Sequence, residues 1–253
     1  MSSFRQSFAW WSCCTKGTNP SDLIKAAVKI GYKGIEMAPK ELWPEIKGAG
    51  LQLVSMGAHQ SLTDGLNKKE NHNRIADEID KNCELAKKEN IHCLIAFSGN
   101  RNGLDDEKGA ANTIEGLLKC KPIAEKHGVL VVLELLNSKV DHADYQCDKT
   151  DWGVKVVSAV NSPKIKLLYD IYHMQIMEGD IIRTIQKHHT LFGHYHTAGH
   201  PGRRDMDDTQ EIHYPGICKA ISATGYTGYL GQEFSPKGDA IQAIEAAFKL
   251  CNV

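Results

Sequence analysis

Four side chains that could bind a metal ion stand at the carboxyl ends of four separate apolar runs. Glu134, Asp170 and Glu233 are carboxylates, and His196 is an imidazole. Burying a carboxylate at the end of an apolar strand is unfavourable unless another group compensates its charge. One shared divalent cation would compensate all three carboxylates. Oxygen ligands with one imidazole favour Mn²⁺ or Mg²⁺, with Zn²⁺ or Co²⁺ as alternatives, over a metal that prefers thiolates.

This set of groups predicts proton-transfer chemistry. A divalent ion that binds a carbonyl and the adjacent hydroxyl acidifies the intervening C–H bond and stabilises the enediolate. Glu134 and Glu233 are the candidates for removing the proton and returning it. Return to the neighbouring carbon is aldose–ketose isomerisation, and return to the same carbon is epimerisation. A rim carboxylate paired with a nearby cation is the alternative for each acid alone, but it does not explain four such endings.

Three further residues are candidates for binding substrate. His173 follows Asp170 at i+3, just beyond the strand end and beside two tyrosines. Arg203 lies on the loop after His196, where a guanidinium can bind an anionic or hydroxylated substrate through two hydrogen bonds. His59 follows the third expected strand, and a pocket role and a structural role fit it equally.

Two histidines, His194 and His196, alternate on the same run, so they are expected on the same face of the strand. His196 lies nearer the end of the strand and is the expected ligand. His194 is expected to pack behind it.

Short apolar runs alternate with stretches of helical periodicity along the whole chain. The expected strands are Ser7–Trp11, Gly34–Met37, Gln52–Gly57, Cys93–Phe97, Val129–Glu134, Ile165–Asp170, Phe192–His196 and Tyr229–Glu233. The expected helices are Pro20–Ile30, Glu41–Ala49, Asn67–Asn90, Lys108–His127, Asp151–Val160, Gly179–Lys187, Pro215–Thr224 and Asp239–Leu250. Eight strands and eight helices in alternation predict an α/β fold, one (β/α)₈ TIM barrel that forms a single domain over residues 1–253.

The composition excludes several classes of protein. The 253 residues carry a net charge of −1, so the positive charge of a nucleic-acid-binding protein is missing. No apolar run approaches the roughly 20 residues that a membrane span needs. The start of the chain has no secretory signal, which predicts a cytoplasmic protein, or a periplasmic one if a leader has been removed. The expected partner is a small-molecule sugar or hydroxy-carbonyl acid, and homo-oligomerisation stays open.

The most distinctive segment is Leu-Leu-Tyr-Asp-Ile-Tyr-His-Met-Gln-Ile-Met-Glu-Gly over residues 167–179. Gly-His-Tyr-His over 193–196 and Gly-Gln-Glu over 231–233 accompany it. With these motifs the chain resembles, over nearly its whole length, the hydroxypyruvate isomerase-like branch of the xylose isomerase-like TIM-barrel superfamily.

The resemblance implies a role for each candidate residue. Glu134, Asp170, His196 and Glu233 would be the ligands of one divalent metal ion. Glu134 and Glu233 would also be the acid–base pair, with His173 and Arg203 contacting substrate. The implied activity is a metal-dependent isomerase of carbohydrate metabolism that acts on aldose, ketose or hydroxypyruvate-like substrates.

Other activities of the same superfamily are alternatives. At the position of His196, hydroxypyruvate and oxo-tetronate isomerases typically have Gln, whereas ketose 3-epimerases have His. A ketose 3-epimerase is therefore an alternative. An inosose-type polyol dehydratase is a further alternative. A DNA-repair enzyme like AP endonuclease is the least favoured alternative. The segment after the fourth expected strand, Phe97-Ser-Gly-Asn100, lacks the histidines of a three-zinc site.

Overall fold

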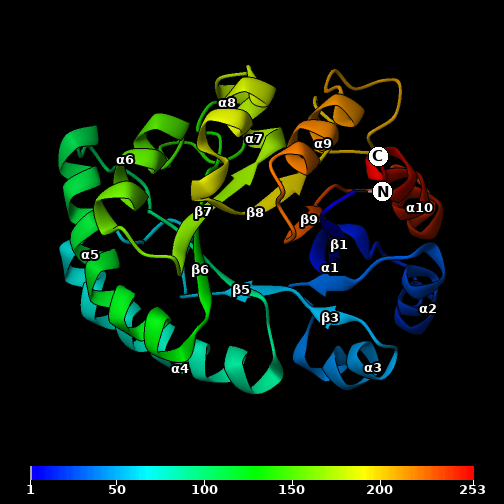
Figure 1. The fold of residues 1–253 in the computed structure, drawn as a ribbon, viewed down its shortest axis with the longest axis horizontal. Coiled ribbons are helices and arrows are strands. Elements are labelled where there is room, and N and C mark those ends of the chain that lie inside the picture. Colours follow the sequence, from blue (N-terminus) through cyan, green and yellow to red (C-terminus); the bar gives the residue numbers. More distant parts are fainter. Residues whose placement is uncertain (1) are drawn as a thin grey trace. The chain divides into compact units, whose positions relative to one another are not determined.

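The structure, a computed structural model, describes residues 2–253. Its strands form one sheet in the order β3-β2-β1-β9-β8-β7-β6-β5-β4, with helices between consecutive strands along most of the chain (Figure 1). The strands are β1 Arg5–Ala9, β2 Gly34–Glu36, β3 Gln52–Leu53, β4 Ser55–Gly57, β5 Cys93–Ala96, β6 Leu130–Glu134, β7 Ile165–Asp170, β8 Phe192–Thr197 and β9 Tyr229–Gln232. Parallel pairing between neighbours confirms the predicted β/α-barrel topology.

The helices cover the strands and follow the expected order. They are α1 Trp10–Cys13, α2 Pro20–Ile30, α3 Trp43–Gly48, α4 His72–Glu89, α5 Asp106–His127, α6 Thr150–Val160, α7 Ile171–Met177, α8 Ile181–His188, α9 Tyr214–Ala223 and α10 Ala240–Cys251, with single 3₁₀ turns at Lys40–Leu42, Lys69–Asn71 and His189–Leu191. None of the helices within residues 2–253 combines the length and the apolar character needed to cross a bilayer.

Local signals in the sequence fix the ends of α2. The side chain of Asn19 accepts a hydrogen bond from the backbone N–H of Asp22, which satisfies a free donor of the first turn. Pro20 occupies the first helical position, and Gly31 ends the helix at φ 117°, a conformation that favours glycine. The helix therefore has the predicted bounds.

Three expectations about the elements were wrong. The strand expected over Gln52–Gly57 is two short strands, because β3 pairs with β2 whereas β4 pairs with β5. The first strand ends at Ala9 rather than at Trp11, since the chain turns directly into α1. No helix was expected between Asp151–Val160 and Gly179–Lys187, but α7 begins directly after Asp170, because that side chain caps its first turn.

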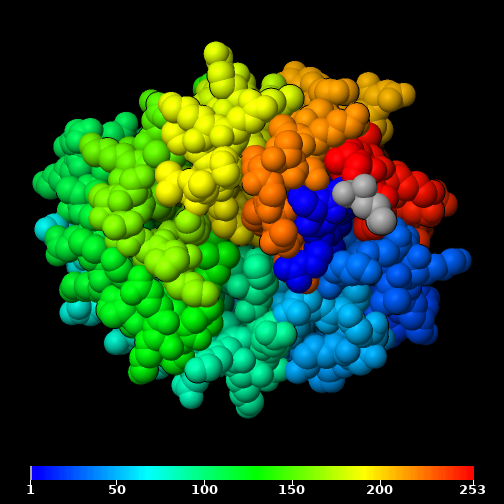
Figure 2. Space-filling model, in the orientation of Figure 1, coloured from blue at the N-terminus to red at the C-terminus, as the bar shows by residue number. Residues whose placement is uncertain are grey.

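The described chain forms two compact units. The first comprises residues up to Val54, Asp180–His189 and His194–Val253, and the second comprises Ser55–Gly179 and Thr190–Gly193. In the first unit Ser2 lies beside the C-terminal residue, with its Oγ 3.2 Å from the carbonyl oxygen of Val253. Figure 2 shows the blue N-terminal and red C-terminal segments next to each other. That the whole chain is a single domain stays a prediction.

The second unit shows why its strands read as continuous apolar runs. In β6, Val131, Val132 and Leu133 are all fully buried, so side chains on both faces of the strand are covered. Helices α4, α5 and α6 pack against one another beside these strands (Figure 1). A parallel strand buried on both faces has few places for polar groups except its ends. The candidate site residues occupy those ends.

Candidate active site

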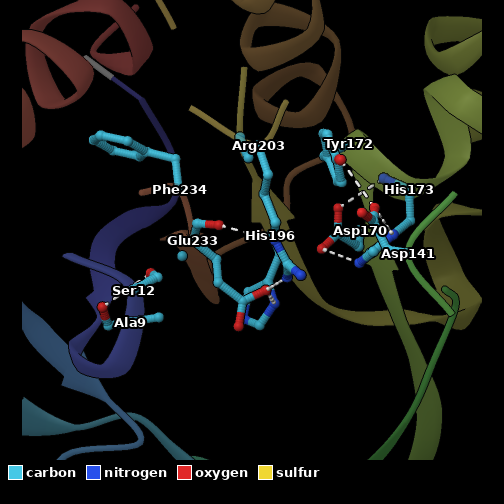
Figure 3. Close-up of polar contacts among 12 residues, drawn as sticks. Ala9, Ser12, Asp141, Asp170, Tyr172, His173, His196, Arg203, Glu233 and Phe234 are labelled. Carbon is cyan, nitrogen blue, oxygen red and sulfur yellow. Dashed lines mark hydrogen bonds and ion pairs between the residues drawn. The ribbon is translucent and has the colours of Figure 1, made fainter. Parts of the chain in front are cut away.

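In the first unit, His196 and Glu233 lie at the carboxyl ends of neighbouring strands. His196 pairs with Gly231, so Glu233 follows two residues later, directly after β9. Nδ1 of His196 is 3.2 Å from Oε2 of Glu233, and both side chains are buried (Figure 3). Two ligand atoms that each lie about 2.1 Å from one ion are about 3 Å apart, so this pair has the spacing of two ligands of one cation.

Arg203 and Trp11 both contact the Glu233 carboxylate. The Arg203 guanidinium is 2.5 Å from Oε2 (Figure 3). The indole N–H of Trp11 donates to Oε1 over 3.0 Å. The guanidinium also lies over the Trp11 ring, 5.2 Å from its centroid. Burial raises the pKa of Glu233, but the attraction of His196 and then of Arg203 outweighs burial and holds the pKa below 4.5. Glu233 is therefore kept ionised, and Arg203 is held beside it.

A second carboxylate in this unit, Glu36, accepts hydrogen bonds from three side chains. Ser7 Oγ donates to Oε1 over 2.6 Å, and Nε2 of His194 lies 3.0–3.1 Å from both carboxylate oxygens. Nε2 of His196 is 3.0 Å from Oε2. Glu36 and both histidines are 0% exposed. Burial raises the pKa of Glu36, but the attraction of His194 and His196 holds it well below its ordinary value.

Sequence reasoning missed Glu36 and Trp11. Glu36 ends strand β2, so the rule that drew attention to the other strand-terminal acids would also have found it. Trp11 gave no such signal, because its contact with Glu233 depends on the turn from β1 into α1. The placement of His194 agrees with expectation, since it shares a strand face with His196, with ring centroids 5.0 Å apart.

In the second unit, Glu134 and Asp170 end the neighbouring strands β6 and β7. Glu134 pairs with Leu168, and Asp170 is two residues further along, so alternation puts both carboxylates on the same face of the sheet. Their exposed fractions are 5% and 1%. One oxygen of Asp170 accepts from the backbone N–H of His173 over 3.1 Å and caps α7. The N-terminal turn of a helix stabilises a negative charge at this position.

His173 is buried within a hydrogen-bond network that fixes the tautomer of its neutral imidazole. The Asn137 side-chain oxygen accepts from the backbone N–H groups of Val140 and Asp141, so its amide nitrogen must face the other way. That nitrogen is 2.6 Å from both Asp141 Oδ2 and Nδ1 of His173. Tyr172 donates to the same Asp141 oxygen over 2.9 Å (Figure 3). Nδ1 therefore accepts, and a neutral His173 carries its proton on Nε2.

His59 is engaged by the backbone on both sides of its ring. Nε2 accepts from the N–H of Phe97 over 3.0 Å, and Nδ1 is 2.9 Å from the carbonyl oxygen of Gln60, to which it must donate. Burial lowers the pKa of this imidazole, so the neutral form is favoured. Between the two roles left open by the sequence, these contacts favour the structural one.

The available donors fit a hard divalent cation. The first unit holds His196 and Glu233, and the second holds Glu134 and Asp170, all buried at strand ends. Three carboxylates and one imidazole are typical ligands for Mn²⁺ or Mg²⁺. That all four bind a single ion stays a prediction.

The sequence of this chain is similar to those of proteins named hydroxypyruvate isomerase. Hydroxypyruvate isomerase from Escherichia coli is 30% identical over 147 residues, which cover 58% of this chain and 55% of that protein. Matches to the vertebrate putative hydroxypyruvate isomerases also span about half the length of those relatives.

Two solved structures share the fold. A structure from Brucella melitensis titled AP endonuclease, family 2, has a TM-score of 0.83 and 25% identity, covering 95% of this chain and 97% of that one. The D-psicose 3-epimerase of Clostridium cellulolyticum H10 has a TM-score of 0.76 and 18% identity, with coverages of 98% and 96%. Residues 24–250 match the family described as Xylose isomerase-like TIM barrel. The chain therefore belongs to the xylose isomerase-like TIM barrel family.

Proposed function

We propose that the chain is a metal-dependent isomerase that moves a proton between adjacent carbons of a hydroxypyruvate-like acid or a sugar. The observation that carries the proposal is the pair of buried carboxylates, Glu134 and Glu233, each at the carboxyl end of a strand. Active sites of TIM barrels occupy that end of the strands. Relatives named hydroxypyruvate isomerase and 2-oxo-tetronate isomerase support the reaction class.

In this proposal Glu134, Asp170, His196 and Glu233 bind one divalent ion, with Mn²⁺ or Mg²⁺ expected. The bound ion would supply Lewis acidity toward a carbonyl and the adjacent hydroxyl of the substrate. One glutamate removes the proton from the carbon that bears the hydroxyl, and the other, in its protonated form, delivers a proton to the neighbouring carbon. The hydroxyl proton passes to the oxygen of the original carbonyl. Both carboxylates must be ionised in turn to act as bases.

In this proposal Arg203 acts on a catalytic carboxylate, and His173 binds the substrate. Arg203 stabilises the ionised form of Glu233, with which it forms a 2.5 Å ion pair. A neutral His173 carries its proton on Nε2, 3.7 Å from Oδ2 of Asp170, and in this proposal it donates a hydrogen bond to a substrate oxygen. Its Nδ1 stays occupied by Asn137, so it does not act as a base through that atom.

A ketose 3-epimerase is the second candidate. His196 is the observation that favours it, because the resemblance associates histidine at this position with the epimerases. The fold of this chain is also similar to that of D-psicose 3-epimerase. An epimerase would return the proton to the carbon from which it was taken, using the same pair of glutamates.

One experiment tests the proposal and separates the two candidates. Purified protein is stripped with a chelator, reloaded with Mn²⁺ or Mg²⁺, and incubated with hydroxypyruvate, with a 2-oxo-tetronate and with a panel of ketohexoses. Conversion of an acid, or of a ketose to an aldose, that depends on the ion supports the isomerase. Conversion of a ketose only to its C3 epimer supports the epimerase. Full activity of the stripped protein on any of these would contradict the metal-dependent proposal.

A further inference from the structure

The contacts of Glu36 also determine which nitrogen of His194 and of His196 carries a proton. Its carboxylate has only acceptor oxygens, so every group that bonds to it must donate. Oε2 lies 3.0 Å from Nε2 of His194 and 3.0 Å from Nε2 of His196. Both imidazoles must therefore carry a proton on Nε2. The nitrogen of His196 that is left to bind a metal ion is then Nδ1, which lies 3.2 Å from Oε2 of Glu233.

A glycine on β9, one of the two strands between β2 and β8, leaves space for the contact between Glu36 and His196. Gly231 pairs with Ser7 on one side and with His196 on the other. A Cβ atom on Gly231 would lie 2.1 Å from Oε1 of Glu36 and 2.9 Å from Cδ2 of His196. Any side chain at residue 231 would push the carboxylate and the imidazole away from their present contact. The backbone of β9 thus leaves the space in which Glu36 meets His196.

We propose that Glu36 is a positioning residue, which keeps the proton of His196 on Nε2 and directs Nδ1 as the ligand atom toward the divalent ion. This inference rests on the proposed function, because it assumes that His196 is a ligand. Carboxylates that accept from the far nitrogen of a metal-binding histidine fix its tautomer and ring orientation, and their loss typically weakens metal affinity about 10–100-fold. Ser7 and His194 also form hydrogen bonds with the Glu36 carboxylate.

The test uses two readouts, neither of which requires turnover. The first is the tautomer of His196 in the metal-free protein, measured from ¹⁵N chemical shifts at a pH where the imidazole is neutral and assigned with H196Q. The second is the dissociation constant for Mn²⁺, measured by competition with a fluorescent chelator. Wild type is expected to carry the proton on Nε2 and to bind Mn²⁺.

Four variants separate positioning from general damage. Glu36→Leu removes the acceptor, so the fixed tautomer should be lost and the dissociation constant should rise about 10–100-fold. Glu36→Gln retains one acceptor oxygen and should restore part of that affinity. Gly231→Ala displaces the carboxylate without changing any charge and should reproduce the loss even if Glu36→Leu folds poorly. Gly48→Ala, where an added Cβ meets nothing within 4 Å, is the matched glycine control and should bind as wild type does.

The possible failures are distinct. If wild type binds no Mn²⁺, the proposed metal site is wrong, and the role of Glu36 toward it is wrong as well. If wild type binds Mn²⁺ and both Glu36→Leu and Gly231→Ala bind it within about threefold of wild type, a range far below the expected loss, only the positioning role is overturned. A wild-type His196 with its proton on Nδ1 would also overturn that role, whatever the affinity for the ion.

Discussion

The amide nitrogen of Asn137 lies 2.6 Å from Nδ1 of His173, and this contact fixes which nitrogen of the imidazole carries the proton. The orientation of the amide is itself fixed, because its oxygen accepts from two backbone N–H groups of the following turn. The pair therefore couples the loop after β6 to the first turn of α7. Removing Asn137 should affect both the stability of the second unit and the donor capacity of His173.

Asn137→Ala is expected to lower the free energy of unfolding by about 1–3 kcal/mol. The reason is that Nδ1 of His173, which is 0% exposed, loses a hydrogen bond that no water replaces readily. Denaturant unfolding of the metal-free protein measures the change. Val140→Ala, in the same turn at a side chain that is 68% exposed, should stay within about 0.5 kcal/mol of wild type. Equal effects of the two substitutions would contradict the argument.

Glu134→Gln and Glu233→Gln should each lower kcat on the true substrate by about 10²–10⁴-fold, since each removes a base in the proposed reaction. Each also removes a charge from the proposed metal site, so Mn²⁺ affinity is measured alongside. Circular dichroism should show an intact fold. Glu245→Gln, which removes an exposed carboxylate paired with Lys249 on α10, is the control and should retain wild-type kcat. Near-wild-type activity of either site variant would rule out the mechanism with two glutamates.

Turnover in D₂O should place deuterium at the reacting carbon of the product. A proton held by a carboxylate exchanges with solvent during its lifetime, whereas a hydride that migrates between carbons does not. Mass spectrometry of the product, together with NMR to locate the label, measures the incorporation. Complete retention of the original hydrogen over many turnovers, with solvent access to the site shown separately, would favour a hydride shift.

Stability should rise with pH on the acid side because of Glu36. The two histidines hold its pKa in the folded protein well below 4.5, so the unfolded chain binds more protons than the folded chain in that range. The stabilisation is complete above the ordinary carboxyl pKa and is lost as the pH falls through the lower folded value. Denaturant unfolding of metal-free protein below pH 4.5 should therefore show a shallower dependence on pH in Glu36→Gln. An unchanged slope would exclude Glu36 as its source.

The sequence alone predicted the alternation of strands and helices and the strand-terminal acids, because both depend on local patterns. Helix α2 and strand β7 have the predicted bounds, since a capping side chain, a terminal glycine or a run of apolar residues determines them. Glu134, Asp170 and Glu233 stood out for the same reason. A carboxylate after a buried strand is unusual wherever the strand lies in the fold.

Contacts between residues far apart in the chain needed the tertiary structure. The bond between Glu36 and His196 joins residues 160 positions apart, and the space for it depends on the absence of a side chain at Gly231 on a third strand. The contact of Trp11 with Glu233 depends on where β1 ends, and that boundary was wrongly expected two residues later. Periodicity identifies a buried face, but the pairing of strands decides which side chains share it.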